Sequence, residues 1–155
     1  MISAQTLRFF PLFSNLPDDI LEQVSKISHL IHIKSREYLF EEGQTAKYLY
    51  LVQTGSISLN LAVPRSDGGV FVQEMDPMKK GELVGWSAII GPQEYNFGVV
   101  ANTPATLVRV DGAGLKQIMH DHPRLGYDLL YKIADVIRER LEMKCMQLLS
   151  LVDSF

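Results

Sequence analysis

The sequence predicts a mainly β domain with helices at both of its ends. Apolar residues recur at helical spacing before His29, alternate with polar residues after it, and return to helical spacing near Leu115. The alternating region consists of short runs separated by turn-forming residues at regular intervals, which is typical of a sandwich or barrel. At 155 residues the chain is long enough for one domain with its own core. We therefore expect a single domain, 1–155, with helices in 1–28, β structure in 29–110 and helices in 111–155.

Two helices are expected in residues 1–28. Residues 3–10 form the first helix, which Pro11 ends because proline cannot continue a helix. The second helix begins near Pro17, and Asp18 and Asp19 fall in its first turn, where acidic side chains favour the helix dipole. The inward-facing apolar residues are Leu7 and Phe10 in the first helix and Ile20, Leu21, Val24 and Ile27 in the second.

Short strands are expected throughout residues 29–110. Each combines alternating apolar side chains with β-branched or aromatic residues, and clusters such as Thr54-Gly55 and Asp76-Pro77 separate one strand from the next. The expected strands are 30–33, 38–40, 48–52, 57–63, 70–75, 97–101 and 105–110.

Residues 111–155 are expected to form a short helix and a long one. The short helix, residues 115–120, ends before Pro123 because the residue before a proline disfavours helical dihedrals. The long helix runs from Arg124 to about Leu151 and carries two apolar stripes, which indicates two packing partners. One stripe, Leu129, Ile133 and Val136, is expected to pack on the strands. The other stripe follows heptad spacing, with Lys144 as its flaw, and predicts a homodimer. The residues of this seam are Tyr127, Leu130, Ala134, Ile137, Leu141 and Leu148.

Residues 80–101 carry the pattern most suggestive of a binding site. A short strand leads to Gly85, which lets the backbone turn sharply, and an apolar helical turn follows from Trp86 until Gly91 and Pro92 stop it. The start of such a turn presents free backbone N–H groups that suit an anion. Glu82 lies just before these groups as a candidate acceptor for hydroxyl groups.

This stretch resembles the phosphate-binding cassette of the cyclic-nucleotide-binding domain, the domain of the catabolite activator family and of kinase regulatory subunits. Together with the long final helix, the likeness covers nearly the whole chain. It rests on Gly81, Glu82 and Leu83 and, earlier in the chain, on Phe40, Gly43, Tyr50 and Gly55 in the family's order.

The resemblance implies both a fold and a set of site residues. The fold is an antiparallel double-stranded β-helix, also called a β-roll or jelly roll, of roughly eight strands. In this family the long C-terminal helix covers the ligand site and dimerises, and Glu82 takes the place of the residue that meets the ribose 2′-hydroxyl. The candidate ligand-binding residues are Gly81, Glu82, Leu83, Gly85, Trp86, Ser87, Ala88, Tyr95 and Asn96.

The family's phosphate-binding arginine has no counterpart in this sequence. Tyr95 stands in its place, Asn96 follows, and residues 81–108 contain no lysine or arginine. Loss of such a charge-assisted contact costs on the order of 2–5 kcal/mol, or about 30-fold to 4,000-fold in affinity. We therefore predict that cyclic AMP and cyclic GMP bind weakly or not at all, and that Tyr95→Arg strengthens cyclic AMP binding. The sequence does not name another cofactor or ligand.

Two functions fit this pattern. In the first, the chain is a stand-alone sensor or regulatory module in which Glu82, Ser87 and Tyr95 face an open cavity that binds a small molecule. In the second, it is a ligand-free dimerisation or protein-interaction module, and Trp86, Phe97 or side chains of the long helix fill the same space. Trp86 then packs in the core instead of stacking on a ligand. Likewise, Tyr95 anchors its loop instead of donating to a ligand, and Glu82 caps backbone N–H groups instead of meeting a hydroxyl.

The sequence also disfavours several functional classes. It has no serine-hydrolase elbow, Walker loop or zinc-protease motif, so no catalytic residue is predicted and the chain is expected not to be an enzyme. A net charge of −3 and the lack of a helix-turn-helix head argue against direct nucleic-acid binding. We expect no metal site, no membrane segment and a cytoplasmic location. The single cysteine, Cys145, is interpreted as a buried, inert thiol, with a redox thiol across a dimer as the alternative.

Overall fold

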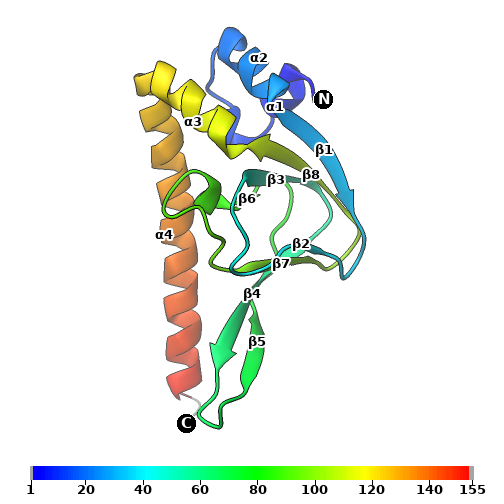
Figure 1. The fold of residues 1–155 in the computed structure, drawn as a ribbon, viewed down its shortest axis with the longest axis vertical. Coiled ribbons are helices and arrows are strands. Elements are labelled where there is room, and N and C mark those ends of the chain that lie inside the picture. Colours follow the sequence, from blue (N-terminus) through cyan, green and yellow to red (C-terminus); the bar gives the residue numbers. More distant parts are fainter. Residues whose placement is uncertain (1, 154–155) are drawn as a thin grey trace.

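The computed structural model describes residues 2–153, with the side chains at positions 147, 148 and 150–153 outside that description. Its strands form two four-stranded sheets, ordered β1-β8-β3-β6 and β2-β7-β4-β5, and their pairings are antiparallel. Helices precede and follow the sheets (Figure 1). The expected fold class, mainly antiparallel β structure with helices at both ends and a long C-terminal helix, is confirmed.

The first sheet lies between two apolar cores. It contains β1 (Ser28–Ile33), β8 (Ala105–Asp111), β3 (Tyr48–Thr54) and β6 (Leu83–Val84). Leu49 and Leu51 of β3 belong to a core shared with the helices, whereas Tyr50 and Val52 belong to the core inside the roll. Because successive side chains of a strand point to opposite faces, β3 is buried on both sides.

The second sheet closes the roll and then extends beyond it. It contains β2 (Tyr38–Phe40), β7 (Gly98–Ala101), β4 (Ile57–Pro64) and β5 (Val70–Glu74). The β4–β5 hairpin projects from the rest of the roll (Figure 1). Consistent with this projection, Val70, Phe71 and Val72 on the edge strand β5 are exposed.

Five helical segments flank the sheets. α1 (Ala4–Leu7), the 3-10 turn η1 (Pro11–Phe13) and α2 (Asp18–Lys26) come before β1, and α3 (Gly112–Asp121) and α4 (Pro123–Asp153) come after β8. α1, α2 and α3 gather at one end of the molecule, and α4 runs along its side (Figure 1). The sequence placed the start of α3 at Leu115, but the helix begins at Gly112 because the Asp111 carboxylate accepts the N–H of Gly114 at 2.8 Å as an N-cap.

One stripe of α4 packs on the rest of the domain as the sequence predicts. Leu129 and Ile133 are buried, and Val136 packs against the same core. Near its start α4 crosses α3 closely at Gly126, where an added Cβ would lie 2.6 Å from the Met119 carbonyl oxygen. These contacts fix α4 against the roll and determine which of its side chains reach the cassette, residues 80–101.

Candidate ligand-binding site

The backbone of the cassette follows the expected order of strand, glycine turn and helical turn, but the helical turn is shorter than expected. β6 leads to Gly85, whose φ of +83° lies in the left-handed region that favours glycine. Trp86–Ala88 then form a single 3-10 turn, η2, rather than a helix reaching Ile90. Gly85 has a second requirement, since an added Cβ would lie 2.8 Å from the Tyr48 carbonyl oxygen. The cassette is therefore held directly against β3.

Tyr95 anchors the cassette loop to the roll. Its ring stacks on Phe40 with centroids 3.7 Å apart and an interplanar angle of 12°. Its hydroxyl donates to the Tyr48 carbonyl oxygen at 2.7 Å and accepts from the Tyr48 N–H at 3.3 Å. Burial raises the pKa of Tyr95 above its ordinary value, and burial likewise raises the pKa of the neighbouring Tyr50. Tyr95 therefore anchors its loop. The substitution Tyr95→Arg would add a positive charge to the crevice, but it would also remove the hydrogen bonds and the ring stack that form this anchor.

The cassette crevice, the space between η2 and the Tyr95 loop, is almost filled. Its residual volume is about 10 Å³, which is at the lower limit for one water molecule. From outside, α4 covers its aromatic rim, with the Arg140 guanidinium carbon 5.0 Å from the Trp86 ring centroid and Lys144 Nζ 5.3 Å from that of Phe97. The residues that line the crevice are Phe40, Leu59, Gly85, Trp86, Ser87, Tyr95, Asn96 and Phe97.

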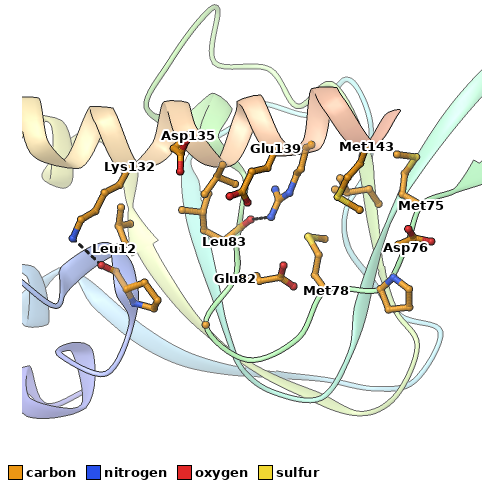
Figure 2. A pocket seen from close by; sticks show the side chains of 16 residues that line it. Leu12, Met75, Asp76, Met78, Glu82, Leu83, Lys132, Asp135, Glu139 and Met143 are labelled. Atoms are coloured by element: carbon orange, nitrogen blue, oxygen red, sulfur yellow. Dashed lines mark hydrogen bonds between the residues drawn. The ribbon is translucent and has the colours of Figure 1, made fainter. Parts of the chain in front are cut away.

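A much larger cavity lies beside the crevice, between α4 and the roll. We call it the helix cavity; its volume is about 380 Å³, within the range of small-molecule sites. Figure 2 shows side chains of α4 on one wall and those of Glu82, Leu83 and Met78 on the other. Its apolar lining is Pro11, Leu12, Leu59, Met75, Pro77, Met78, Leu83, Val136 and Met143.

Arg140 is the cation at the boundary between the crevice and the helix cavity. It comes from α4, donates through Nη2 to the Leu83 carbonyl oxygen, and lies over Trp86. Its Nη1 is buried without a hydrogen-bond partner among the described residues. Desolvation lowers the pKa of Arg140 to about 10, although Glu82 and Glu139 attract the charge and oppose this shift. The guanidinium is therefore charged near neutral pH but incompletely satisfied.

The other charged groups around the helix cavity have partners of their own. Glu82 is exposed and accepts the Lys79 backbone N–H at 2.7 Å, and Lys132 Nζ donates to the Pro11 carbonyl oxygen at 2.9 Å. Asp135 and Glu139 lie 3.0 Å and 3.9 Å from the guanidinium nitrogens of Arg138. Within residues 2–153, no group of three or more metal-ligating side chains is found, and no helix is long and apolar enough to cross a membrane.

The structure divides the predicted site residues between the two spaces. Gly81, Glu82 and Leu83 line the helix cavity, whereas Gly85, Trp86, Ser87, Tyr95 and Asn96 line the crevice. Ala88 is buried inside the roll. Glu82 therefore does not converge with Ser87 and Tyr95, and their ligand-binding roles stay predictions. Sequence reasoning missed Arg140, although the stripe 129, 133, 136 continues at helical spacing to 140 and points this side chain at the roll.

The predicted seam lies on the outer side of α4. Tyr127 is 66% exposed and Leu141 60% exposed, Leu130 and Ala134 are also exposed, and Ile137 is half-buried. Leu148, the last predicted seam residue, has a side chain outside the described residues. Cys145 is an exposed free thiol, so the expectation that it is buried is wrong. The apolar seam is accessible to a partner.

The fold and the cassette agree with comparisons to known proteins. The family model described as "Cyclic nucleotide-binding domain" matches residues 30–122, which is more than half of the chain. This chain belongs to the cyclic nucleotide-binding domain family. The match spans both sheets, the cassette and α3, and it ends just before α4. The domain proper therefore contains the crevice, whereas Arg140 comes from the helix that follows it.

This chain is similar to proteins of different kinds. NTE family proteins of Mycobacterium bovis and Mycobacterium tuberculosis are 23% identical to this chain over 133 residues, and the match covers 86% of this chain but 21% of theirs. Among solved structures, a Geobacter metallireducens protein named for cyclic nucleotide binding has a TM-score of 0.77 and 26% identity, covering 91% of this chain and 99% of that one. A regulatory subunit of a cAMP-independent protein kinase A from Trypanosoma brucei has a TM-score of 0.69 and 18% identity, covering 84% and 45%.

Proposed function

We propose that this cyclic nucleotide-binding domain is a regulatory module that senses a small molecule in the helix cavity and transmits its presence through α4. The placement of α4 is the observation that supports this function. The helix walls the cavity through Val136 and Met143, and its Arg140 donates to the backbone of β6. A ligand in the cavity would therefore contact the helix directly and compete with the packing that holds it.

Cyclic AMP and cyclic GMP are, in this proposal, not the natural ligands. The crevice that carries Ser87 and Tyr95 retains about 10 Å³, and the Tyr95 hydroxyl is engaged by the Tyr48 backbone. Residues 81–108 supply no cation to face a cyclic phosphate. A neighbour with the same fold is named as cAMP-independent, so the fold itself does not require that nucleotide.

The output of the module, in this proposal, is the seam of α4. The exposed apolar residues of the seam would be removed from water if α4 packed against α4 of a second copy, because two helices with heptad stripes pack along those stripes. A ligand that shifts α4 would then change how two copies meet. We propose this regulatory role, rather than a catalytic one, for a cytoplasmic homodimer.

A ligand-free interaction module is the second candidate. The filled crevice favours it, because its lining, which includes Trp86 and Phe97, leaves a volume of only about 10 Å³, and Arg140 and Lys144 lie over these two rings. In this alternative the roll only supports the seam of α4. The helix cavity distinguishes the two, since a pure scaffold has no use for an open space of this size beneath its dimerising helix.

Titration calorimetry with cyclic AMP and cyclic GMP tests the ligand assignment. We expect no binding at micromolar concentration by the native chain, and a measurable gain in Tyr95→Arg only if an arginine at this position still reaches the cassette N–H groups. Sub-micromolar binding of either nucleotide by the native chain would refute the assignment, since another group would then supply the positive charge.

Filling the helix cavity tests the coupling to α4. Met143→Trp adds bulk to the cavity wall. Met146→Trp is the matched control, because it adds the same bulk three residues later in α4, at a 70%-exposed position that does not line the cavity. We expect Met143→Trp, but not Met146→Trp, to change amide hydrogen exchange along α4 and the fraction of dimer. Identical behaviour of both variants and the native chain would instead favour the ligand-free module.

A further inference from the structure

The helix cavity combines a continuous apolar wall with one incompletely satisfied cation. We propose that it binds an organic monoanion with an aliphatic body, a medium-chain alkyl carboxylate such as decanoate, with Arg140 as the counter-ion. This inference rests on the proposed sensor function and adds the chemical class of the ligand. The argument follows from the size of the cavity, its lining, and the distribution of charge around it.

The size and lining of the cavity suit an aliphatic chain. At about 30 Å³ for each water-sized group, 380 Å³ holds roughly a dozen non-hydrogen atoms, as many as decanoate has. Three methionines line the walls, Met75, Met78 and Met143, and their unbranched thioethers adapt to flexible apolar ligands. Leu12, Leu83 and the prolines complete a surface that an aliphatic chain would remove from water.

Arg140 provides the group that recognises the anion. Nη2 donates to Leu83, Trp86 lies against the guanidinium, and Nη1 has no partner among the described residues. A planar guanidinium matches a carboxylate in geometry, and a buried cation gains most from an acceptor when it has none. The described ion pairs assign no carboxylate to Arg140 within salt-bridge distance. A ligand carboxylate would supply the missing partner.

Binding at Arg140 also involves the position of α4. Nη1 is covered in the structure, so a carboxylate reaches it only if the guanidinium turns or α4 moves away from β6. Either change loosens the contact with the Leu83 carbonyl oxygen. Occupancy of the cavity and placement of the helix are thereby coupled through one side chain.

Acidic residues around the cavity favour a single negative charge over two. Asp76, Glu82, Asp135 and Glu139 all line it, against Lys132 and Arg140. Asp135 and Glu139 are paired with Arg138, and Lys132 donates to the Pro11 carbonyl oxygen, so Arg140 is the lining cation with a buried donor that lacks a partner among the described residues. A dianion such as inorganic phosphate would meet more repulsion than a monocarboxylate and would leave the apolar wall exposed.

Calorimetry below micellar concentration, with four probes, tests the proposal. Decanoate should bind, and decanol, decylammonium and inorganic phosphate should bind at least tenfold more weakly. Arg140→Gln should lower decanoate affinity about tenfold to a hundredfold, while Arg124→Gln, at an exposed position near the start of the same helix and away from the cavity lining, should leave it unchanged. Met143→Trp should block decanoate without altering Arg140, which keeps the test valid if Arg140→Gln fails to fold.

Each outcome is informative. Equal binding of decanoate and decanol, unchanged binding in Arg140→Gln, or tighter binding of decylammonium would each overturn the anion assignment. If decanoate fails to bind but Met143→Trp still alters α4 exchange, the ligand class is wrong and the sensor function survives. If both effects are absent, the sensor function fails as well.

Discussion

The hydroxyl of Tyr95 exchanges two hydrogen bonds with the backbone of Tyr48, donating to its carbonyl oxygen at 2.7 Å and accepting from its N–H at 3.3 Å. The pair joins the end of the cassette loop to the start of β3. It matters for function because the family resemblance of the sequence predicts that Tyr95 takes the place of the phosphate-binding arginine. In this structure the Tyr95 side chain anchors its loop to β3 and to Phe40.

Tyr95→Phe should destabilise the domain by about 1–3 kcal/mol, because the substitution removes the hydroxyl and leaves the Tyr48 carbonyl and N–H groups without it. The stack on Phe40 survives, so the loss isolates the two hydrogen bonds. Urea unfolding measures the effect. Tyr131→Phe, at a 66%-exposed tyrosine of α4, is the matched control and should change the unfolding free energy by less than about 0.5 kcal/mol. Equal losses in the two variants would contradict the anchor role.

The close approach of the cassette to β3 predicts a difference between two glycines. Gly85 and Gly91 have nearly the same φ, +83° and +85°, so alanine at either position carries the same left-handed penalty of about 1–2 kcal/mol. Only Gly85 has a neighbour in the way, the Tyr48 carbonyl oxygen at 2.8 Å from an added Cβ. Gly85→Ala should therefore lose at least about 1 kcal/mol more than Gly91→Ala. Urea or thermal unfolding checks this, and equal losses would show that the cassette can move away from β3.

Local sequence patterns predicted most of the helices and strands, and the family resemblance implied that the strands form a roll. Alternation within β3 and β4, the proline before α4, and the stripe Leu129, Ile133 and Val136 each depend on residues close in sequence. The start of α3 was missed by three residues because the prediction relied on apolar spacing rather than on the Asp111 cap. Patterns of neighbouring residues therefore predicted which helices and strands form, and the boundaries of these elements were predicted less accurately.

The candidate site was less predictable because its key contact is long-range. Arg140 and Leu83 are 57 residues apart, and only the packing of α4 brings them together. Residues 81–108 contain no lysine or arginine, and the sequence did not indicate that α4 places Arg140 at the edge of the cassette. The separation of Glu82 from Ser87 and Tyr95 was missed for a similar reason, since it depends on which side of β6 each residue faces.

Leu141→Asp should convert a dimer to a monomer. Leu141 is 60% exposed on the seam of α4, so in a dimer it is buried against the partner, and a buried unpaired carboxylate is strongly unfavourable. Phe9→Asp is the matched control, since it places the same charge at an 83%-exposed apolar residue of the N-terminal segment. Sedimentation at micromolar concentration should give half the mass for Leu141→Asp and the dimer mass for the native chain and Phe9→Asp. A monomeric native chain would contradict the seam.

The pH dependence of decanoate binding should identify Arg140 as its counter-ion. Desolvation lowers the pKa of Arg140 to about 10, and the charged groups that face it are Glu82 and Glu139, which attract its charge. The guanidinium is protonated below this pKa, so the ion pair is fully available there and is lost as pH rises through about 10. At the acidic end, a carboxylic acid of ordinary pKa, about 4 to 5, loses its charge as pH falls.

Affinity for decanoate should therefore stay constant from pH 6 to 9, fall below about pH 5 and fall again near pH 10. Burial raises the pKa of both Tyr50 and Tyr95, so these phenols add no negative charge to the roll within that plateau. Decanol, which has no ionisable group, is the control, and its affinity should not fall below about pH 5 or near pH 10. A midpoint near pH 6.5, the ordinary value for histidine, would instead assign the anion to a histidine and remove Arg140 from the site.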